Sequence, residues 1–176
     1  MGWIELHSYD PAWREHFEAE RNRIREIASD ELLEVFHIGS TSIPEFVAKP
    51  SIDILVVYAT ESAIHDAKER FPDECRTHRD EEDRVILIRE TEDLSFTVHL
   101  RPHAAQGWRD QLVFRELLRE DPCARAKYEG AKRTDASEYP NDGKAYTSAK
   151  EPIIQSLTEQ AYQEGYDEQL PDFATE

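Results

Sequence analysis

Residues 35–57 read VFHIGSTSIPEFVAKPSIDILVV, and this stretch decides the fold. Residues 35–38 form a short apolar run that predicts a buried strand, and residues 52–57, rich in β-branched side chains, predict a second one. Between them, Gly-Ser-Thr-Ser at 39–42 allows a tight turn and brings hydroxyl groups with little bulk. Asp53 stands near the start of the second strand. A small-residue loop after one strand and a carboxylate in the next favour a site that holds a phosphate together with a metal ion.

A structural interpretation of the same residues stands beside this one. Residues 39–42 would then form an ordinary turn, and Asp53 would be a strand acid that points into water. Two features argue against it: Asp53 has apolar neighbours on both sides, and Lys49 precedes it by four residues. A lone carboxylate at the start of a buried strand needs a cation, a proton or a metal ion.

The motif resembles the signature of the GrpB family. The matching residues are HIGSTSIP at 37–44, AKP at 48–50 and IDI at 52–54. YDPAW at 9–13 is similar to the opening of the family, and VHL at 98–100 to a later strand. The residues that follow in the family's order are Phe114, Arg115, Leu118, Arg119, Tyr128, Lys132, Tyr146 and Lys150. The resemblance covers roughly residues 3–160, and on it the chain is identified as a member of the family.

This resemblance implies membership of the nucleotidyltransferase superfamily. The superfamily pattern is Gly-Ser followed by Asp-x-Asp/Glu, with a third acid on a later strand. Gly39, Ser40 and Asp53 fit the pattern, with twelve residues between Ser40 and Asp53. Leu55 takes the place of the second acid, and His99 takes the place that resembles the third. The resemblance therefore implies catalytic roles for Asp53 and His99, with Asp53 also as the ligand of a metal ion.

Two histidines near the motif have different predicted roles. His99 is a metal ligand, a proton donor or a hydrogen-bonded core histidine, and the residues alone leave all three open. His37, just before the turn, is predicted to hold the loop by hydrogen bonds. Glu45 stands where the family usually has glycine after Ile-Pro, so the shape of the loop is an open question.

The rest of the chain predicts an α/β (α+β) fold, a nucleotidyltransferase-like mixed sheet flanked by helices, with a helical C-terminal half. We expect helices at about 10–30, 61–71, 108–119, from 121 onwards and at 145–163, and a hairpin of strands 85–88 and 96–100. The charged residues 76–83 predict a solvated loop or an eroded strand. Residues 1–165 form one domain, and 166–176 an acidic, mobile tail.

The composition is strongly acidic, with 38 acidic and 21 basic side chains and a formal net charge of −17 at pH 7. A lysine-poor, acidic surface is typical of proteins from a salt-rich cytoplasm, where salt screens self-repulsion, so we expect a halophilic, cytoplasmic protein. The same charge argues against a nucleic-acid partner. Cys75 and Cys123 lack C-x-x-C spacing, which favours reduced thiols. We expect no membrane span and, from residues 1–6, no signal peptide.

Basic side chains of the second half are the expected anion ligands. Arg115 and Arg119 share a helix face at i,i+4, where like charges disfavour each other unless an anion lies between them. Neighbouring carboxylates are the alternative partners. The planar fork of arginine suits phosphate and carboxylate groups. The predicted phosphate-binding residues are Gly39, Ser40, Thr41, Ser42, Lys49, Arg115, Arg119, Lys132 and Lys150. We expect the basic side chains among them to converge on one pocket.

Two functions follow from these residues. The first is a nucleotidyltransferase-like protein that binds a nucleotide or another phosphorylated metabolite with Mg²⁺ beside Asp53. Two-metal phosphoryl transfer needs bridging carboxylates, but one Mg²⁺ is held by one or two carboxylates plus the phosphates of a substrate. Transfer of a nucleotidyl group to an unknown acceptor is therefore compatible with this pattern. The second is a non-catalytic ligand-binding or folding accessory domain, since similar domains are fused to dephospho-coenzyme A kinase.

Overall fold

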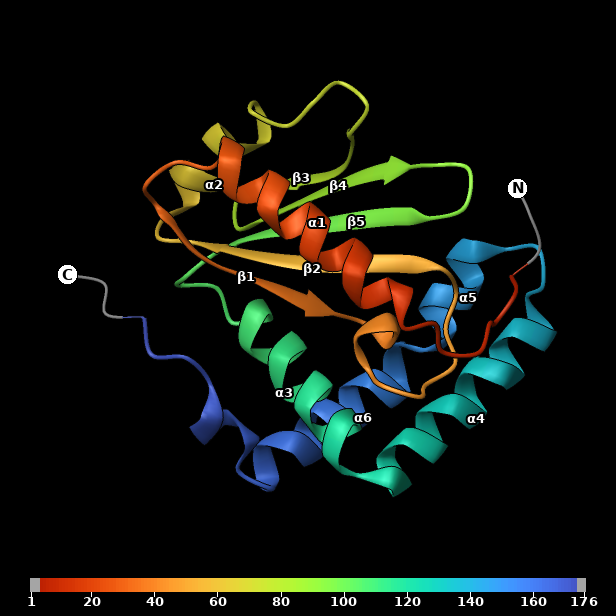
Figure 1. Cartoon of the computed structure of the whole chain (residues 1–176). Helices are drawn as coiled ribbons and strands as arrows, with labels where there is room; N and C mark the ends of the chain where they lie inside the picture. Colours follow the sequence, from red (N-terminus) through yellow and green to blue (C-terminus); the bar gives the residue numbers. More distant parts are fainter. Residues whose placement is uncertain (1–3, 174–176) are drawn as a thin grey trace.

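One five-stranded sheet organises the protein, whose computed structural model describes residues 4–173 (Figure 1). The strands are β1 Leu32–Ile38, β2 Ser51–Tyr58, β3 Arg76–Glu81, β4 Arg84–Glu90 and β5 Ser95–Pro102. Their order in the sheet is β1-β2-β5-β4-β3. β2 and β5 are parallel, and the other neighbouring strands are antiparallel. A mixed sheet with flanking helices confirms the predicted fold class.

Helices cover both faces of this sheet. They are α1 Ala12–Ile27, α2 Glu61–Lys68, α3 Gly107–Glu120, α4 Pro122–Glu138, α5 Gly143–Ala149 and α6 Glu151–Gln163, with 3-10 turns η1 Ser40–Ser42 and η2 Tyr166–Gln169. Apolar side chains of α1 and α2 pack in one core cluster with one face of β2, while α3 packs in a second cluster with its other face. Figure 1 shows α3 to α6 gathered as a helical half beside the sheet.

The alternation of β2 decides which side Asp53 faces. Ile52 and Ile54 belong to the core cluster that includes α1 and α2, whereas Leu55 belongs to the cluster that includes α3. Because successive side chains of a strand point to opposite faces, Asp53 points to the same face as Leu55. The carboxylate therefore lies on the side of the sheet where the helical half packs.

Most predicted elements lie within a few residues of the observed ones. The predicted hairpin is β4 and β5, which pair antiparallel with Val85 opposite Leu100. Asp121 accepts hydrogen bonds from the first backbone N–H groups of α4, as expected for a capping acid before a proline. Residues 76–81 form an exposed edge strand, the second of the two alternatives for this segment.

The prediction of one continuous helix over 145–163 is wrong. The chain forms α5 up to Ala149 and starts again as α6 at Glu151. Pro152 lies in the first turn of α6. Proline has no backbone N–H and is tolerated in the first turn of a helix but not in its interior. The break places Lys150 between two helices rather than inside one.

The last described residues pack against the helical half. Tyr166 and Leu170 join the core cluster that includes α3, α4 and α6. The division into a domain of 1–165 and a mobile tail of 166–176 stays a prediction, and residues 174–176, like 1–3, lie outside the described part. Within residues 4–173, no helix combines the length and the apolar character needed to cross a membrane.

Candidate functional site

The loop after β1 lies directly on the Asp53 side chain. Gly39 has φ 72°, a backbone conformation that favours glycine. A Cβ atom at Gly39 would approach the carboxylate closely and lie 3.0 Å from both Cβ and Cγ of Asp53. In the antiparallel register of β1 and β2, Ile38 is opposite Asp53, which brings the two segments together. The space between loop and strand therefore admits only glycine at position 39.

Hydrogen bonds inside the loop occupy two of its three hydroxyl groups. Thr41 Oγ1 donates to the Ser51 carbonyl oxygen at 3.1 Å, and Ser42 Oγ donates to the Gly39 carbonyl. Both side chains are buried. These two hydroxyls therefore serve the shape of the loop, and their predicted contact with a phosphate stays a prediction.

His37 is one of the residues that hold this loop, as predicted. Its Nε2 lies 2.9 Å from Thr41 Oγ1 and its ring stacks on Phe17. Because the Thr41 proton is donated to Ser51, the imidazole Nε2–H is the donor in this pair. Burial lowers the pKa of His37 to about 4, so the ring is neutral at pH 7.

Glu45 resolves the open question about the loop's shape. It has φ 63°, the left-handed conformation in which glycine costs least. The backbone therefore follows the path that a glycine would follow, with a glutamate side chain attached.

Lys132 is a buried cation beneath the loop. Its side chain comes from α4, and the residue is 2% exposed. Nζ donates to Ser40 Oγ and to the Val47 carbonyl oxygen, each at 2.7 Å. The rings of Phe46 and Tyr128 lie 4.8 and 5.4 Å from Nζ. Two of its three donors are thus used, and the aromatic faces offset part of the desolvation of the ammonium group.

Three lysines line one narrow cleft with Asp53. We call this space, about 100 Å³ between the loop, β2, α4 and α5, the lysine cleft; it is lined by Gly39, Ser40, Thr41, Ala48, Lys49, Ser51, Asp53, Tyr128, Lys132, Tyr146 and Lys150. Burial, then the charges of Lys150 and Lys49, lowers the pKa of Lys132 to about 7. Burial and the charge of Lys49 lower the pKa of Lys150 to about 8, and burial also lowers the pKa of Lys49. The Asp53 carboxylate opposes all three shifts.

Two of these ammonium groups have no polar partner. Within residues 4–173, Nζ of Lys49 and of Lys150 makes no hydrogen bond and no ion pair. Each lies over the ring of Tyr146, at 5.0 and 4.2 Å from its centroid. Partly desolvated cations without a hydrogen-bond acceptor form a site that an anion stabilises.

His99 lies beside Asp53, as the motif predicts. Its Nε2 is 3.7 Å from Asp53 Oδ1, and the Asp53 side chain is 28% exposed. His99 Nδ1 is buried and has no hydrogen-bond partner among the described residues. His99 does not line the lysine cleft, so it contacts the site through Asp53.

The side chains do not fit a Mg²⁺ ion held by the protein alone. Within residues 4–173, no group of three or more His, Cys, Asp and Glu side chains is placed to hold a metal ion. Leu55, in the place of the second acid, is fully buried. Mg²⁺ prefers oxygen ligands, whereas three lysines face Asp53 across the cleft.

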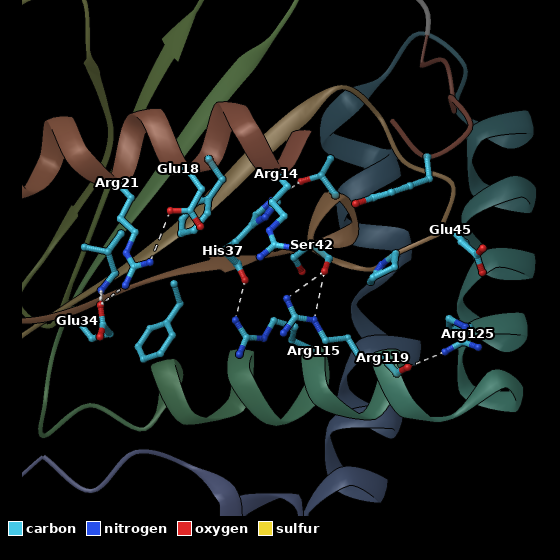
Figure 2. Close-up of a pocket in the computed structure, with 16 residues that line it drawn as sticks. Arg14, Glu18, Arg21, Glu34, His37, Ser42, Glu45, Arg115, Arg119 and Arg125 are labelled. Carbon is cyan, nitrogen blue, oxygen red and sulfur yellow. Dashed lines mark hydrogen bonds and ion pairs between the residues drawn. The ribbon is translucent and has the colours of Figure 1, made fainter. Parts of the chain in front are cut away.

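Arg115 and Arg119 line a different and larger cavity, of about 690 Å³, shown in Figure 2. Arg115 Nη1 donates to the His37 carbonyl at 2.9 Å, and Arg119 donates twice to the Ser42 carbonyl, at 3.2 and 3.1 Å. Thr41 lines both spaces. The expectation that the basic residues converge on one pocket is therefore wrong, because α3 lies on the other side of the loop from the lysines.

The structure adds residues that the sequence did not single out as site residues. Tyr128 and Tyr146 line the lysine cleft, and each precedes its lysine by four residues on a helix or at its end. This repeated Tyr-x-x-x-Lys spacing was the signal for both. Asp135, buried on α4, has an Oδ2 atom without a hydrogen-bond partner in the described part, and its charge, like that of Asp53, opposes the lowering of the pKa of Lys150 by burial. No spacing in the sequence pointed to it.

A family profile described as "GrpB protein" matches residues 3–160. The chain belongs to the GrpB family. This GrpB-family chain is 33% identical over 158 residues to a UPF0157 protein of Streptomyces coelicolor, across 90% of this chain and 84% of that protein. It spans about half the length of two other relatives. These are UPF0157 protein YqkA of Bacillus subtilis, 27% identical over 90% of this chain and 47% of the relative, and a dephospho-CoA kinase of Mycolicibacterium paratuberculosis, 28% identical over 90% and 46%.

Solved structures agree with this assignment. Conserved protein GrpB from Enterococcus faecalis has a TM-score of 0.82 at 28% identity, covering 92% of this chain and 99% of that one. The Cid1 poly(U) polymerase, with Mg and 3'-dATP bound, has a TM-score of 0.54 at 11% identity, over 82% and 49% of the two chains. At this identity the likeness to Cid1 concerns the fold alone. The fold of this chain is thus distantly similar to that of Cid1.

Proposed function

We propose that this GrpB-family chain binds a phosphorylated small molecule, such as a nucleotide, with a phosphate group in the lysine cleft. The observation that carries the proposal is the convergence of Lys49, Lys132 and Lys150 on a cleft with one carboxylate, Asp53. Two of the three ammonium groups have no polar partner within residues 4–173. A phosphate dianion supplies the missing charge and the missing hydrogen-bond acceptors at once.

The size of the cleft limits what enters it. Its volume of about 100 Å³ is roughly that of three water molecules at about 30 Å³ each. A phosphoryl group fits such a space, whereas a nucleoside does not. The remainder of the ligand therefore lies outside, with Ser40 Oγ and the free donors of the lysines directed at its phosphate.

Mg²⁺ enters this proposal only together with the ligand. Asp53 offers one carboxylate, and phosphate oxygens of a bound ligand would supply further ligands of the kind that Mg²⁺ prefers. Nucleotidyl transfer is the reaction class that the motif of Gly39, Ser40 and Asp53 implies, and a fold similar to that of Cid1 is compatible with it. In that case Asp53 lies nearest the reacting phosphate, His99 acts on the site through Asp53, and the lysines stabilise the charge of the leaving group.

A non-catalytic binding or accessory domain is the second candidate. Two observations favour it: Leu55 replaces the second acid and is fully buried, and the chain is similar to part of a dephospho-CoA kinase. Both candidates bind a phosphate in the lysine cleft. They differ in whether the protein then transfers a nucleotidyl group.

Calorimetric titration with nucleoside triphosphates, with and without Mg²⁺, tests the proposal. Lys150→Gln removes one partner-free ammonium group, and we expect it to raise the dissociation constant at least tenfold. Lys144→Gln is the matched control, because Lys144 is an exposed lysine of α5, the helix that Lys150 caps, and does not line the cleft. Asp53→Asn should retain the Mg²⁺-independent part of binding and lose the Mg²⁺-dependent part.

Three results would overturn parts of this proposal. Equal effects of the Lys150 and Lys144 variants would remove the lysine cleft as the phosphate site. Unchanged Mg²⁺ dependence in Asp53→Asn would remove the metal. Binding without release of pyrophosphate, whatever nucleophile is offered, would favour the non-catalytic domain.

A further inference from the structure

We propose that the larger cavity between α1 and α3 is a second binding site, which takes a small molecule through its phosphate group. We call it the arginine cavity. Its volume of about 690 Å³ lies within the range of roughly 300–1,000 Å³ that is common for small-molecule pockets. It shares only Thr41 with the lysine cleft, so its ligand is a separate molecule.

Guanidinium groups from two helices line this cavity. Figure 2 shows Arg14 reaching from the first turn of α1 toward Arg115 and Arg119, which reach up from α3. Burial, followed by the charge of Arg119, lowers the pKa of Arg115. Like charges brought together from separate elements repel, and an anion between them converts the repulsion into attraction.

The charge of the cavity is opposite to that of the chain. Five arginines and three glutamates line it, in a chain of 38 acidic and 21 basic side chains. Two of the glutamates are already paired: Glu18 pairs with Arg21, and Glu34 pairs with both Arg21 and Arg25. The side chain of Arg14, by contrast, makes no hydrogen bond or ion pair within the described residues, and only its backbone N–H donates, to the Pro11 carbonyl. The excess of positive charge is therefore concentrated around Arg14 and the arginines of α3.

Arg115 and Arg119 are held in place before any ligand arrives. Each donates to a backbone carbonyl of the loop region, and each also pairs with Glu116. A guanidinium group has five N–H donors, and an Arg–phosphate contact uses up to two of them in a fork. Fixed side chains lose little entropy on binding, so this pair provides a preorganised phosphate contact.

The remaining wall suits the carbon body of an organic phosphate. Tyr9, Phe17 and Phe36 line the cavity beside the arginines. An apolar wall with a few charged groups at one end is the usual composition of a metabolite site. The arrangement therefore points to a phosphate ester of a small organic molecule, with its phosphate at Arg14, Arg115 and Arg119.

The test uses the full chain, with inorganic pyrophosphate and phenyl phosphate as probes at constant ionic strength. In the Lys150→Gln background, where the lysine cleft is weakened, both probes should still bind. Adding Arg14→Gln should then raise the dissociation constant at least fivefold. Arg14 is exposed and its side chain has no partner in the described part, so its variant should keep the melting temperature. Arg133→Gln, an exposed arginine of α4 outside the cavity, is the matched control.

Each outcome decides for or against the arginine cavity. An Arg14→Gln effect matched by Arg133→Gln would reduce the site to general charge attraction and overturn the proposal. Loss of all binding in Lys150→Gln alone would overturn it too, because a single site would then explain the data. Phenyl phosphate binding more tightly than pyrophosphate supports an ester with an apolar body. The reverse order would remove the apolar wall from the proposal. If Lys150→Gln has no effect on binding while Arg14→Gln weakens it, the proposed function in the lysine cleft is overturned and the site in the arginine cavity stands.

Discussion

Gly39 shows how much one residue contributes to the site. The loop backbone lies against Asp53, and any side chain at position 39 collides with the carboxylate. The motif assigned Gly39 and Asp53 to one predicted site, but the steric contact between the Gly39 backbone and the carboxylate became visible only in the structure. The hydrogen bonds that Thr41 and Ser42 donate to backbone carbonyls could not be predicted either, because the sequence shows which residues share a loop but not which acceptor each hydroxyl binds.

We expect Gly39→Ala to lower the free energy of unfolding by at least about 2 kcal/mol. A residue with a side chain in the backbone conformation of Gly39 by itself costs about 1–3 kcal/mol. The collision with Asp53 adds to this cost. Urea unfolding measures the change. Gly130→Ala is the control: it lies in α4 with nothing within 4 Å of a new Cβ, so it should stabilise by about 0.5–1 kcal/mol. Equal effects of the two substitutions would contradict the steric account.

Lys132 makes stability depend on pH. Its pKa is about 7 in the folded protein and 10.5 without perturbation. Between these values the unfolded chain binds a proton that the folded protein lacks, so the free energy of unfolding rises with pH. One such group contributes a slope of up to about 1.4 kcal/mol per pH unit.

Lys132→Met removes this titration. We therefore expect the free energy of unfolding of the variant to rise less steeply with pH than that of the unmodified protein, by up to about 1.4 kcal/mol per pH unit. Chemical unfolding at pH 7.5, 8.5 and 9.5 gives both curves. Lys150 adds a smaller dependence of the same sign above pH 8, which both proteins share. Parallel curves would show that Lys132 keeps its ordinary pKa.

At the scale of elements, the sequence predicted the helices and strands better than the side on which each helix packs. The strands on either side of the loop, the β4–β5 hairpin and the capped start of α4 followed from local patterns. Arg115 and Arg119 were correctly placed on one helix face, but periodicity cannot tell which side of the loop that face meets. Only the packing of α3 against β1 and β2 sets it apart from the lysines of α4 and α5.

Pro152 makes the same point in another way. The residue was visible in the sequence, and its effect depended on where a helix restarts. Because α6 begins at Glu151, the proline lies in a first turn, and Lys150 becomes the cap between two helices. A continuous helix would have fixed Lys150 on a regular helix face, so the break is part of how the lysine cleft forms.

At the scale of the whole molecule, the net charge of −17 predicts a dependence on salt. Self-repulsion acts over a Debye length of about 30 Å at 0.01 M salt and about 3 Å at 1 M. We therefore expect the melting temperature to rise as KCl increases from 0.1 to 2 M. Scanning calorimetry with KCl, and with a neutral osmolyte at matched osmolality as control, measures it. A flat profile would end the interpretation as a salt-adapted protein.

Thr41 belongs to the walls of both cavities, and this gives the loop a thermodynamic consequence. Lys132 donates a hydrogen bond to Ser40 on one side of the loop, and Arg119 donates one to the Ser42 carbonyl on the other. A ligand in one cavity that displaces the loop therefore changes the shape, and so the affinity, of the other cavity. Linkage requires such an effect to be reciprocal: the factor by which one ligand changes the affinity of the second equals the factor in the opposite direction. The backbone of residues 40–42 would then couple the affinities of two anions that are not in contact with each other.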